Sequence, residues 1–262
     1  LLSQCFKVLI GLGLLFTVFL SGSPLSLPGS RILEYIVFLF SATLGMMLIA
    51  SSVDLVTLFV SMELSSYSLY LLSALRLDHR NAESTVKYLI LGAAGSGIFL
   101  WGASFVVGLS GTASFAGLSQ SPASGHPAFI LGLILILFAF LFKLSAVPMH
   151  FWAPDVYERA PTPVTSFIAT ASKAAAVAVL VRFLISSPVS TTLTGVLVVF
   201  AFVSMTLGNT AALLQKDVKR LLAYSSIAQA GYILVGLLAQ TPEGYASALF
   251  YALAYLLMNT GV

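Results

Sequence analysis

Long apolar runs follow one another through all 262 residues of this chain, with only short polar connections between them. A helix that crosses a bilayer needs about 20 mostly apolar residues, with a range of about 17 to 25. Nine runs of this size are predicted, at residues 5–21, 32–51, 54–75, 84–108, 129–147, 163–186, 192–214, 221–239 and 244–262. The runs lack the alternation that marks the strands of a membrane β-barrel. The sequence therefore predicts an all-α membrane protein, a polytopic transmembrane helix bundle formed by one domain over residues 1–262.

The composition excludes several other classes of protein. Only 8% of the residues are charged and 59% are hydrophobic, whereas an ordinary soluble domain has roughly 25% charged residues. Disorder requires low hydrophobicity and high charge, so it is excluded as well. The net charge of +3 is spread over the whole chain and forms no basic patch, so nucleic acid is not an expected partner.

No sequence motif indicates a bound cofactor or metal. Cys5 is the only cysteine, which excludes an intramolecular disulfide and a metal cluster held by cysteines. No phosphate-binding glycine motif and no histidine or cysteine spacing typical of a metal site occurs. We therefore expect this chain to hold no cofactor or metal.

Basic residues in the connections predict the orientation, because cytoplasmic loops carry an excess of Lys and Arg. The connections after the first, third, fifth and seventh runs hold seven basic residues, namely Arg31, Arg76, Arg80, Arg159, Lys216, Lys219 and Arg220. The opposite side has only Lys7 and Arg182. The start of the chain is thus predicted to lie outside the cytoplasm. Since the chain lacks an initiator Met and stops inside an apolar run, we expect it to be an internal part of a longer protein.

Two charged residues lie near the centres of predicted spans. Glu63 has about ten residues of the third run on either side, and Lys173 is central in a stretch of small residues. A charge at that depth costs about 2.5–3.5 kcal/mol on insertion scales. One interpretation is that Glu63 and a lysine form a structural ion pair. The other is a proton relay, because burial and a nearby carboxylate shift the proton affinity of a lysine in opposite directions.

Lys143 precedes a proline-rich segment. Pro148, Pro154, Pro161 and Pro163 fall within sixteen residues, and each proline removes one helical hydrogen bond. Irregular backbone at membrane depth is tolerated only inside protein or beside a cavity. The pattern predicts a broken helix bordering a hydrated cavity, as is common at ion paths in transporters. The alternative is that Lys143 ends the fifth span near the surface and the prolines form an ordinary loop.

Lys87 and His150 are secondary candidates. Lys87 lies four residues after Glu83, near the start of the fourth run, so an ion pair at a helix end also explains it. His150 has a side chain suited to proton exchange, but beside Trp152 it equally fits an anchor at the level of the lipid headgroups. Asp155 and Glu158 border spans, and no special role is predicted for them.

The segment around the prolines resembles a known signature. Residues 143–167, KLSAVPMHFWAPDVYERAPTPVTSF, followed by ASKA at 171–174, are similar to the antiporter-like membrane subunits of proton-pumping NADH:quinone oxidoreductase, respiratory complex I. Within that family, WAPDVY at 152–157, ATLGMM at 42–47 and LLAYSSIAQAGY at 221–232 look most like the subunit N group. The resemblance covers essentially the whole chain. The motif departs from the family pattern at Arg159, where glycine is expected.

The resemblance implies both a fold and roles for the buried charges. The family fold has fourteen helices with two inverted five-helix repeats and broken helices, and the nine predicted spans would be the third to the eleventh. Glu63 and Lys143 would form a switching pair, and Lys173 would pass the proton laterally along the membrane arm. The second broken helix, with its own lysine, would lie beyond Val262.

The resemblance also implies a function: translocation of protons across the membrane, coupled to quinone reduction in other subunits. Flavin mononucleotide, iron–sulfur clusters and quinone are expected in those other subunits. The expected partners are the other membrane-arm subunits, the lipid bilayer and protons. The expected location is the bacterial cytoplasmic membrane, or else the mitochondrial inner or thylakoid membrane.

Two other functions stay open at this point. The chain could instead serve a multi-subunit cation/proton antiporter, which shares the ancestral fold. A passive scaffold is the third alternative. Against a scaffold, the three lysines Lys87, Lys143 and Lys173 within apolar runs outnumber the single buried acid, Glu63, and unpaired buried charge is costly.

Overall fold

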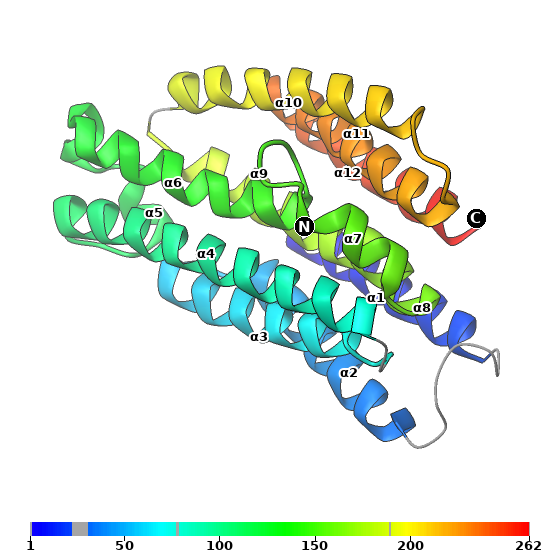
Figure 1. Ribbon diagram of the computed structural model, residues 1–262. Helices are drawn as coiled ribbons and strands as arrows, with labels where there is room; N and C mark the ends of the chain where they lie inside the picture. Colours follow the sequence, from blue (N-terminus) through cyan, green and yellow to red (C-terminus); the bar gives the residue numbers. More distant parts are fainter. Residues whose placement is uncertain (1, 23–30, 77–78, 189, 262) are drawn as a thin grey trace.

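The computed structural model describes residues 2–22, 31–76, 79–188 and 190–261, and the regular elements of these residues are helices (Figure 1). The helices are α1 (Leu2–Ser21), α2 (Ile32–Ile49), α3 (Leu55–Ser73), α4 (His79–Ser110), α5 (Phe115–Leu118), η2 (Pro122–Gly125), α6 (Pro127–Leu144), α7 (Trp152–Arg159), α8 (Thr162–Phe167), η3 (Ile168–Ser172), α9 (Lys173–Ser186), α10 (Ser190–Ala212), α11 (Val218–Leu238) and α12 (Pro242–Thr260). The prediction of an all-α bundle is confirmed.

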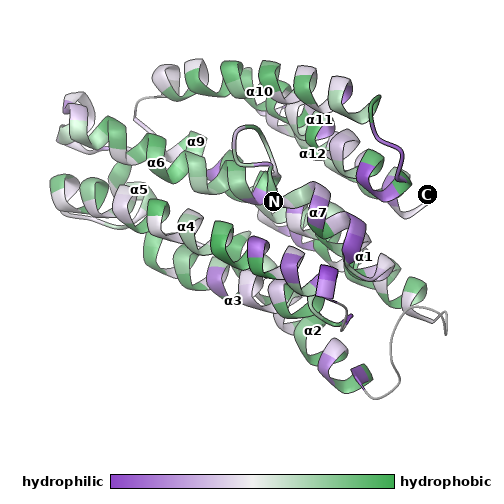
Figure 2. Ribbon diagram, viewed as in Figure 1, coloured by the Kyte–Doolittle hydropathy of each residue, from purple (hydrophilic) through white to green (hydrophobic). Residues whose placement is uncertain are grey.

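Eight helices of the described residues are long and apolar enough to cross a membrane. They correspond to the first eight predicted runs, with the α8–η3–α9 segment counted as one helix. The ninth run forms α12, which is not among the eight, so its passage through the membrane stays a prediction. The fourth run was predicted too short, because its polar start at His79 continues the same 32-residue helix. Hydrophobic residues dominate the helices in Figure 2.

The helix made of α8, η3 and α9 lies at the centre of the bundle. Its most apolar window is 89% buried, against 28–56% for the other seven candidate spans. It packs against α1, α2, α6 and α12. Residues 168–172 form a π-helical turn within it, a local widening that is frequent at functional sites. Lys173 follows this turn directly.

The predicted break after Lys143 is confirmed. α6 ends at Leu144, and Ser145 closes it in the left-handed conformation, with φ 60°. The chain then turns and forms the separate short helix α7 before α8 begins. Backbone groups freed by the break find new partners: the N–H of Val147 donates to Oγ of Ser204 at 2.9 Å. The hydrated cavity predicted beside the break stays a prediction.

Helices α4 and α6 approach closely at a pair of glycines. A Cβ atom on Gly102 would lie 2.6 Å from the carbonyl oxygen of Gly132, and one on Gly132 would lie 2.7 Å from the carbonyl oxygen of Gly102. Both distances are far below an ordinary van der Waals contact, which is about 3.5 Å or more. Small residues let helix backbones pack this closely inside a membrane.

The long polar connection between α4 and α6 holds the short helices α5 and η2. Within it, the N–H of Phe115 donates to the carbonyl oxygen of Val53, and the N–H of Leu55 to that of Ala113. These bonds fix the connection to the start of α3. There, Asp54 caps α3 by accepting hydrogen bonds from the backbone N–H and the hydroxyl of Thr57.

Candidate functional site

Lys143 lies in the last turn of α6 and is only 8% exposed. Its Nζ donates to Oγ of Ser66 at 2.6 Å and to Oγ of Ser65 at 3.1 Å. A longer contact of 3.5 Å reaches the carbonyl oxygen of Met62. All three acceptors belong to α3, and all are uncharged. The ammonium group is therefore held by hydroxyl and carbonyl dipoles, not by a carboxylate.

Glu63 lies on the same turn of α3 but faces α4. Its carboxylate accepts a 2.5 Å hydrogen bond from the hydroxyl of Ser96. The salt bridges found among the described residues do not include a pair between Glu63 and Lys143. The structural ion pair is therefore not formed in this structure, because Glu63 bonds Ser96 of α4 while Lys143 bonds serines of α3. Their role as a switching pair stays a prediction.

Lys173 is the more deeply buried lysine, at 2% exposure. Its Nζ donates to the backbone carbonyl oxygen of Ser226 at 2.6 Å and to Oγ of the same residue at 2.5 Å. The ring of Tyr255 lies 5.6 Å from Nζ, at a distance that allows a cation–π contact. Sequence reasoning missed Ser226 because the bundle fold alone brings it to a lysine 53 residues away.

A small enclosed void lies between Lys143 and the central helix. Its volume is about 10 Å³, which is at the lower limit for one water molecule. Its lining includes Ser65 beside Lys143 and Ser172 beside Lys173. Lys143 thus borders a small interior space beside the central helix, whereas Nζ of Lys173 faces Ser226 of α11.

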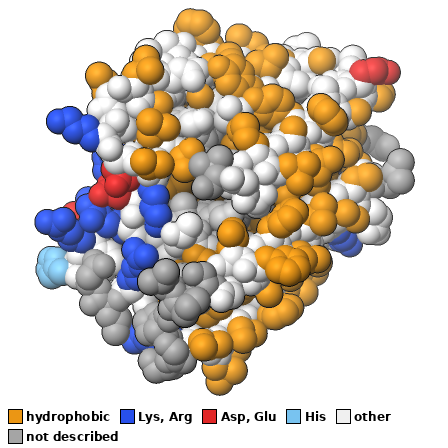
Figure 3. Space-filling view, turned by 90° about the vertical axis from the view of Figure 1, so that its right-hand side faces the viewer, with side chains coloured by type: hydrophobic (Ala, Val, Ile, Leu, Met, Phe, Trp, Pro, Cys, Tyr) orange, Lys and Arg blue, Asp and Glu red, His pale blue; other side chains and the backbone are white. Residues whose placement is uncertain are grey.

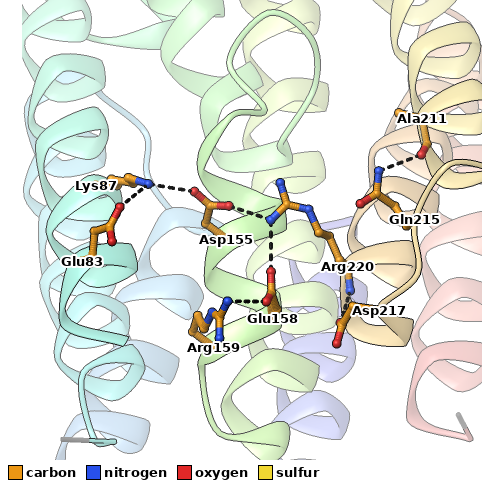
Figure 4. Close-up of polar contacts among 9 residues, drawn as sticks. All are labelled: Glu83, Lys87, Asp155, Glu158, Arg159, Ala211, Gln215, Asp217 and Arg220. Atoms are coloured by element: carbon orange, nitrogen blue, oxygen red, sulfur yellow. Dashed lines mark hydrogen bonds and ion pairs between the residues drawn. The ribbon is translucent and has the colours of Figure 1, made fainter. Parts of the chain in front are cut away.

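Lys87 belongs to a different, exposed group of charges (Figure 4). Its side chain is 50% exposed, and Nζ pairs with Glu83 at 2.8 Å and with Asp155 at 3.3 Å. The prediction of a helix-end ion pair is confirmed. The count of three lysines buried in apolar runs was wrong, because Lys87 reaches the surface at the polar start of α4. Two buried lysines remain.

Asp155 and Glu158, for which no role was predicted, hold this group together. Arg220 of α11 donates through one guanidinium nitrogen to both carboxylates, at 3.0 Å each, while Arg159 pairs with Glu158 at 2.5 Å. The surface charge cluster therefore joins α4, α7 and α11, and it lines a cleft of about 210 Å³. Figure 3 shows charged side chains gathered at one edge of a mostly hydrophobic face.

His150 lies in the turn between α6 and α7 and is 6% exposed. Its ring centroid is 4.4 Å from that of Phe151, and its buried Nδ1 has no hydrogen-bond partner among the described residues. A headgroup anchor requires an exposed polar tip, so the structure disfavours that interpretation. Proton exchange at His150 stays a prediction.

Together these features define a class of protein: an all-helical, multi-pass membrane protein that keeps two lysines in its interior. Ionisable residues inside a membrane are expensive, and they commonly mark ion paths and proton relays. Among the described residues, no group of three or more His, Cys, Asp or Glu could hold a metal ion.

Comparison with known proteins identifies the family. Residues 52–262 match the family model "NADH:quinone oxidoreductase/Mrp antiporter, TM". The chain is 47% identical over 263 residues to NADH-quinone oxidoreductase subunit N 2 of Syntrophobacter fumaroxidans, covering 99% of this chain and 56% of that protein. It is 44% identical to NAD(P)H-quinone oxidoreductase subunit 2 of Thermosynechococcus vestitus, covering 99% and 51%. The chain belongs to the family of antiporter-like membrane subunits of complex I, and it spans about half the length of these curated relatives.

Solved structures agree with this assignment. A chain of respiratory complex I from Thermus thermophilus superposes with a TM-score of 0.86 at 38% identity, covering 99% of this chain and 55% of the other. A chain of the Mrp complex from Dietzia has the same TM-score at 23% identity, covering 99% and 48%. The second likeness establishes the shared fold alone.

Proposed function

We propose that the full-length protein is a membrane-arm subunit of an NADH:quinone oxidoreductase and translocates protons, driven by quinone reduction in other subunits. Lys143 and Lys173 carry the proton through the interior, and Glu63 modulates Lys143 from the neighbouring face of α3. The observation that carries the proposal is the burial of two lysines whose hydrogen-bond partners are all neutral.

Neutral surroundings suit a relay better than a scaffold. A buried lysine with a fixed carboxylate partner is held in its charged form, whereas a lysine among hydroxyls and carbonyls has no counter-charge that fixes its proton. A static structure gains nothing from such groups, since apolar residues of similar size would pack at lower cost. A lysine that loads and releases a proton requires surroundings of this kind.

The relatives favour a redox-driven complex over a separate antiporter. Similarity to the quinone oxidoreductase subunits reaches 47% identity, whereas the Mrp chain is at 23%. On this proposal the chain itself holds no cofactor. Flavin mononucleotide, iron–sulfur clusters and quinone belong to other subunits, and the partners are the other membrane-arm subunits, the surrounding lipid and protons. The proposed location is the bacterial cytoplasmic membrane, and the bacterial and cyanobacterial sources of the relatives support it.

The proposal is tested with the full-length chain in its assembled complex. Lys143→Ala and Lys173→Ala are each expected to lower proton translocation and the coupled quinone reduction, because the interior path loses a carrier. Lys87→Ala should have a smaller effect, since water can replace an exposed ion pair. Lys216→Ala, which changes an exposed loop residue, is the matched control.

Assembly of each variant is checked first, by the recovery of the intact complex from native gels. A Lys173→Ala complex that assembles and pumps at the rate and proton-to-electron ratio of the unmodified complex would refute the relay and favour the scaffold. If the full-length chain is purified together with iron–sulfur and flavin subunits, the oxidoreductase is supported. If it is purified in an assembly without cofactors, the antiporter is supported.

A further inference from the structure

Three buried hydroxyl groups lie between Lys173 and the end of α6. They belong to Ser226 of α11, Tyr157 of α7 and Ser145, the residue that closes α6. All three residues are buried, with 2% exposure or less. They come from three separate elements, so only the folded bundle brings them together. We call them the hydroxyl chain.

Ser226 is the centre of the hydroxyl chain. Its Oγ accepts hydrogen bonds from Nζ of Lys173 at 2.5 Å and from the phenol of Tyr255 at 2.8 Å. A serine hydroxyl offers two lone pairs and a single proton to donate. With both lone pairs occupied, the proton of Ser226 is directed to its remaining neighbour, the phenol oxygen of Tyr157 at 3.3 Å.

Tyr157 continues the path towards the break. Its phenol lies near the hydroxyl of Ser145, which makes no hydrogen bond of ordinary geometry with any described residue. A buried hydroxyl without a partner is costly and calls for an explanation. Ser145 stands two residues after Lys143, in the strained left-handed cap of α6. The hydroxyl of Ser145 therefore lies where a proton would leave the hydroxyl chain towards Lys143.

We propose that Ser226, Tyr157 and Ser145 carry the proton between Lys173 and the broken end of α6. In the transfer, an N–H bond of Lys173 breaks as an O–H bond forms on Ser226. Ser226 gives its own proton to Tyr157, and Tyr157 gives its own to Ser145. Ser145 passes a proton to one water molecule, which delivers it to neutral Lys143. Each hydroxyl gains and loses one proton, so none is left charged.

The enclosed void beside Lys143 offers the competing route. There, one water molecule would bridge Lys143 and the central helix near Ser172. The two routes use different hydroxyls. Variants of Tyr157 and of Ser172 therefore distinguish them.

The inference rests on the proposed function and is tested in the same assembled complex. Tyr157→Phe removes one hydroxyl and keeps the ring, so the complex is expected to assemble. Its proton translocation should fall about tenfold or more, within the range that positioned proton-transfer groups contribute. Tyr35→Phe is the matched control, because it removes a buried phenol that bonds Ser21, at the far end of α1.

Two further readouts separate proton transfer from packing. Ser226→Ala should slow translocation as Tyr157→Phe does, while Ser226→Thr, which keeps the hydroxyl, should retain most of the rate. The ratio of the rates in H₂O and D₂O should rise in Tyr157→Phe, since a slowed proton step then limits turnover. A purely structural role would leave that ratio unchanged.

The outcomes are distinguishable from those of the lysine variants. If Lys173→Ala stops translocation while Tyr157→Phe matches Tyr35→Phe, the hydroxyl chain is refuted and the relay stands. If Ser172→Ala is the slow variant instead, the void carries the proton. If Lys173→Ala itself pumps normally, the proposed function fails first.

Discussion

Replacing Gly102 by alanine should separate α4 from α6. The new Cβ would lie 2.6 Å from the carbonyl oxygen of Gly132, 2.9 Å from Cβ of Leu135 and 3.0 Å from the backbone N of Ile136. Two of these atoms are backbone, so no side-chain rotation relieves the contact. The helices must move apart by roughly 1 Å to reach an ordinary separation of about 3.5 Å.

The size of the effect follows from a comparison with Gly97 on the same helix. A Cβ at Gly97 would meet no atom within 4 Å. Both substitutions gain the preference of helices for alanine, about 0.8–1.0 kcal/mol, so this gain cancels in the difference between them. What remains is the cost of overpacking, typically about 1–3 kcal/mol. Gly102→Ala should therefore be less stable than Gly97→Ala by about that amount.

The assay is the free energy of unfolding of the purified full-length chain in mixed micelles, obtained by titration with dodecyl sulfate and followed by circular dichroism. Gly132→Ala should behave like Gly102→Ala. The double variant should cost less than the sum of the single ones, because one movement of the helices relieves both contacts. Equal stability of Gly102→Ala and Gly97→Ala would show that the close approach of α4 and α6 is not rigid, and would refute the reasoning.

Two more predictions concern the ends of the helices. Asp54→Ala should destabilise α3 by about 1 kcal/mol, measured in the same titration, and the difference from the unmodified chain should be largest above the ordinary carboxyl pKa. The hydrogen bonds from Thr57 lower the pKa of Asp54. The stabilisation by Asp54 is therefore lost as the pH falls through that lowered value. A difference in unfolding free energy between Asp54→Ala and the unmodified chain that stays constant down to pH 2 would contradict this. Single cysteines that replace Arg76 and Lys219 should react with an impermeant reagent only from the cytoplasmic side. If they are labelled from outside intact cells, the predicted orientation is wrong.

The helix content and the break after Lys143 were predictable from the sequence because they depend on local properties. Apolar length determines where a helix can cross a membrane, and proline removes a donor wherever it stands. The end of α6 was placed three residues late, at residue 147, because the left-handed cap at Ser145 has no glycine to mark it. The π-helical turn before Lys173 is marked by no proline or glycine in the sequence.

The partners of the charges were less predictable because they depend on which helices are neighbours. Lys143 lies in α6, yet its acceptors Ser65 and Ser66 belong to α3, 78 and 77 residues away. The environment of Lys87 was partly predicted, through Glu83 on the same helix. Its contact with Asp155 required the folded position of α7.

The two faces of α7 are attached to the bundle by contacts that respond differently to ionic strength. The outer face of α7 is held through Asp155 and Glu158 to Lys87 and Arg220, in pairs that are partly exposed. The Debye length is about 10 Å at an ionic strength of 0.1 M and shortens as salt is added, so salt weakens the attraction within exposed pairs. Its inner face is held by Trp152, whose ring stacks on that of Tyr88 with 4.4 Å between the ring centroids. Salt does not screen this uncharged contact. High salt would therefore weaken the ion pairs on the outer face of α7 and leave its aromatic contact in place. The apolar contacts between the long helices would stay unchanged.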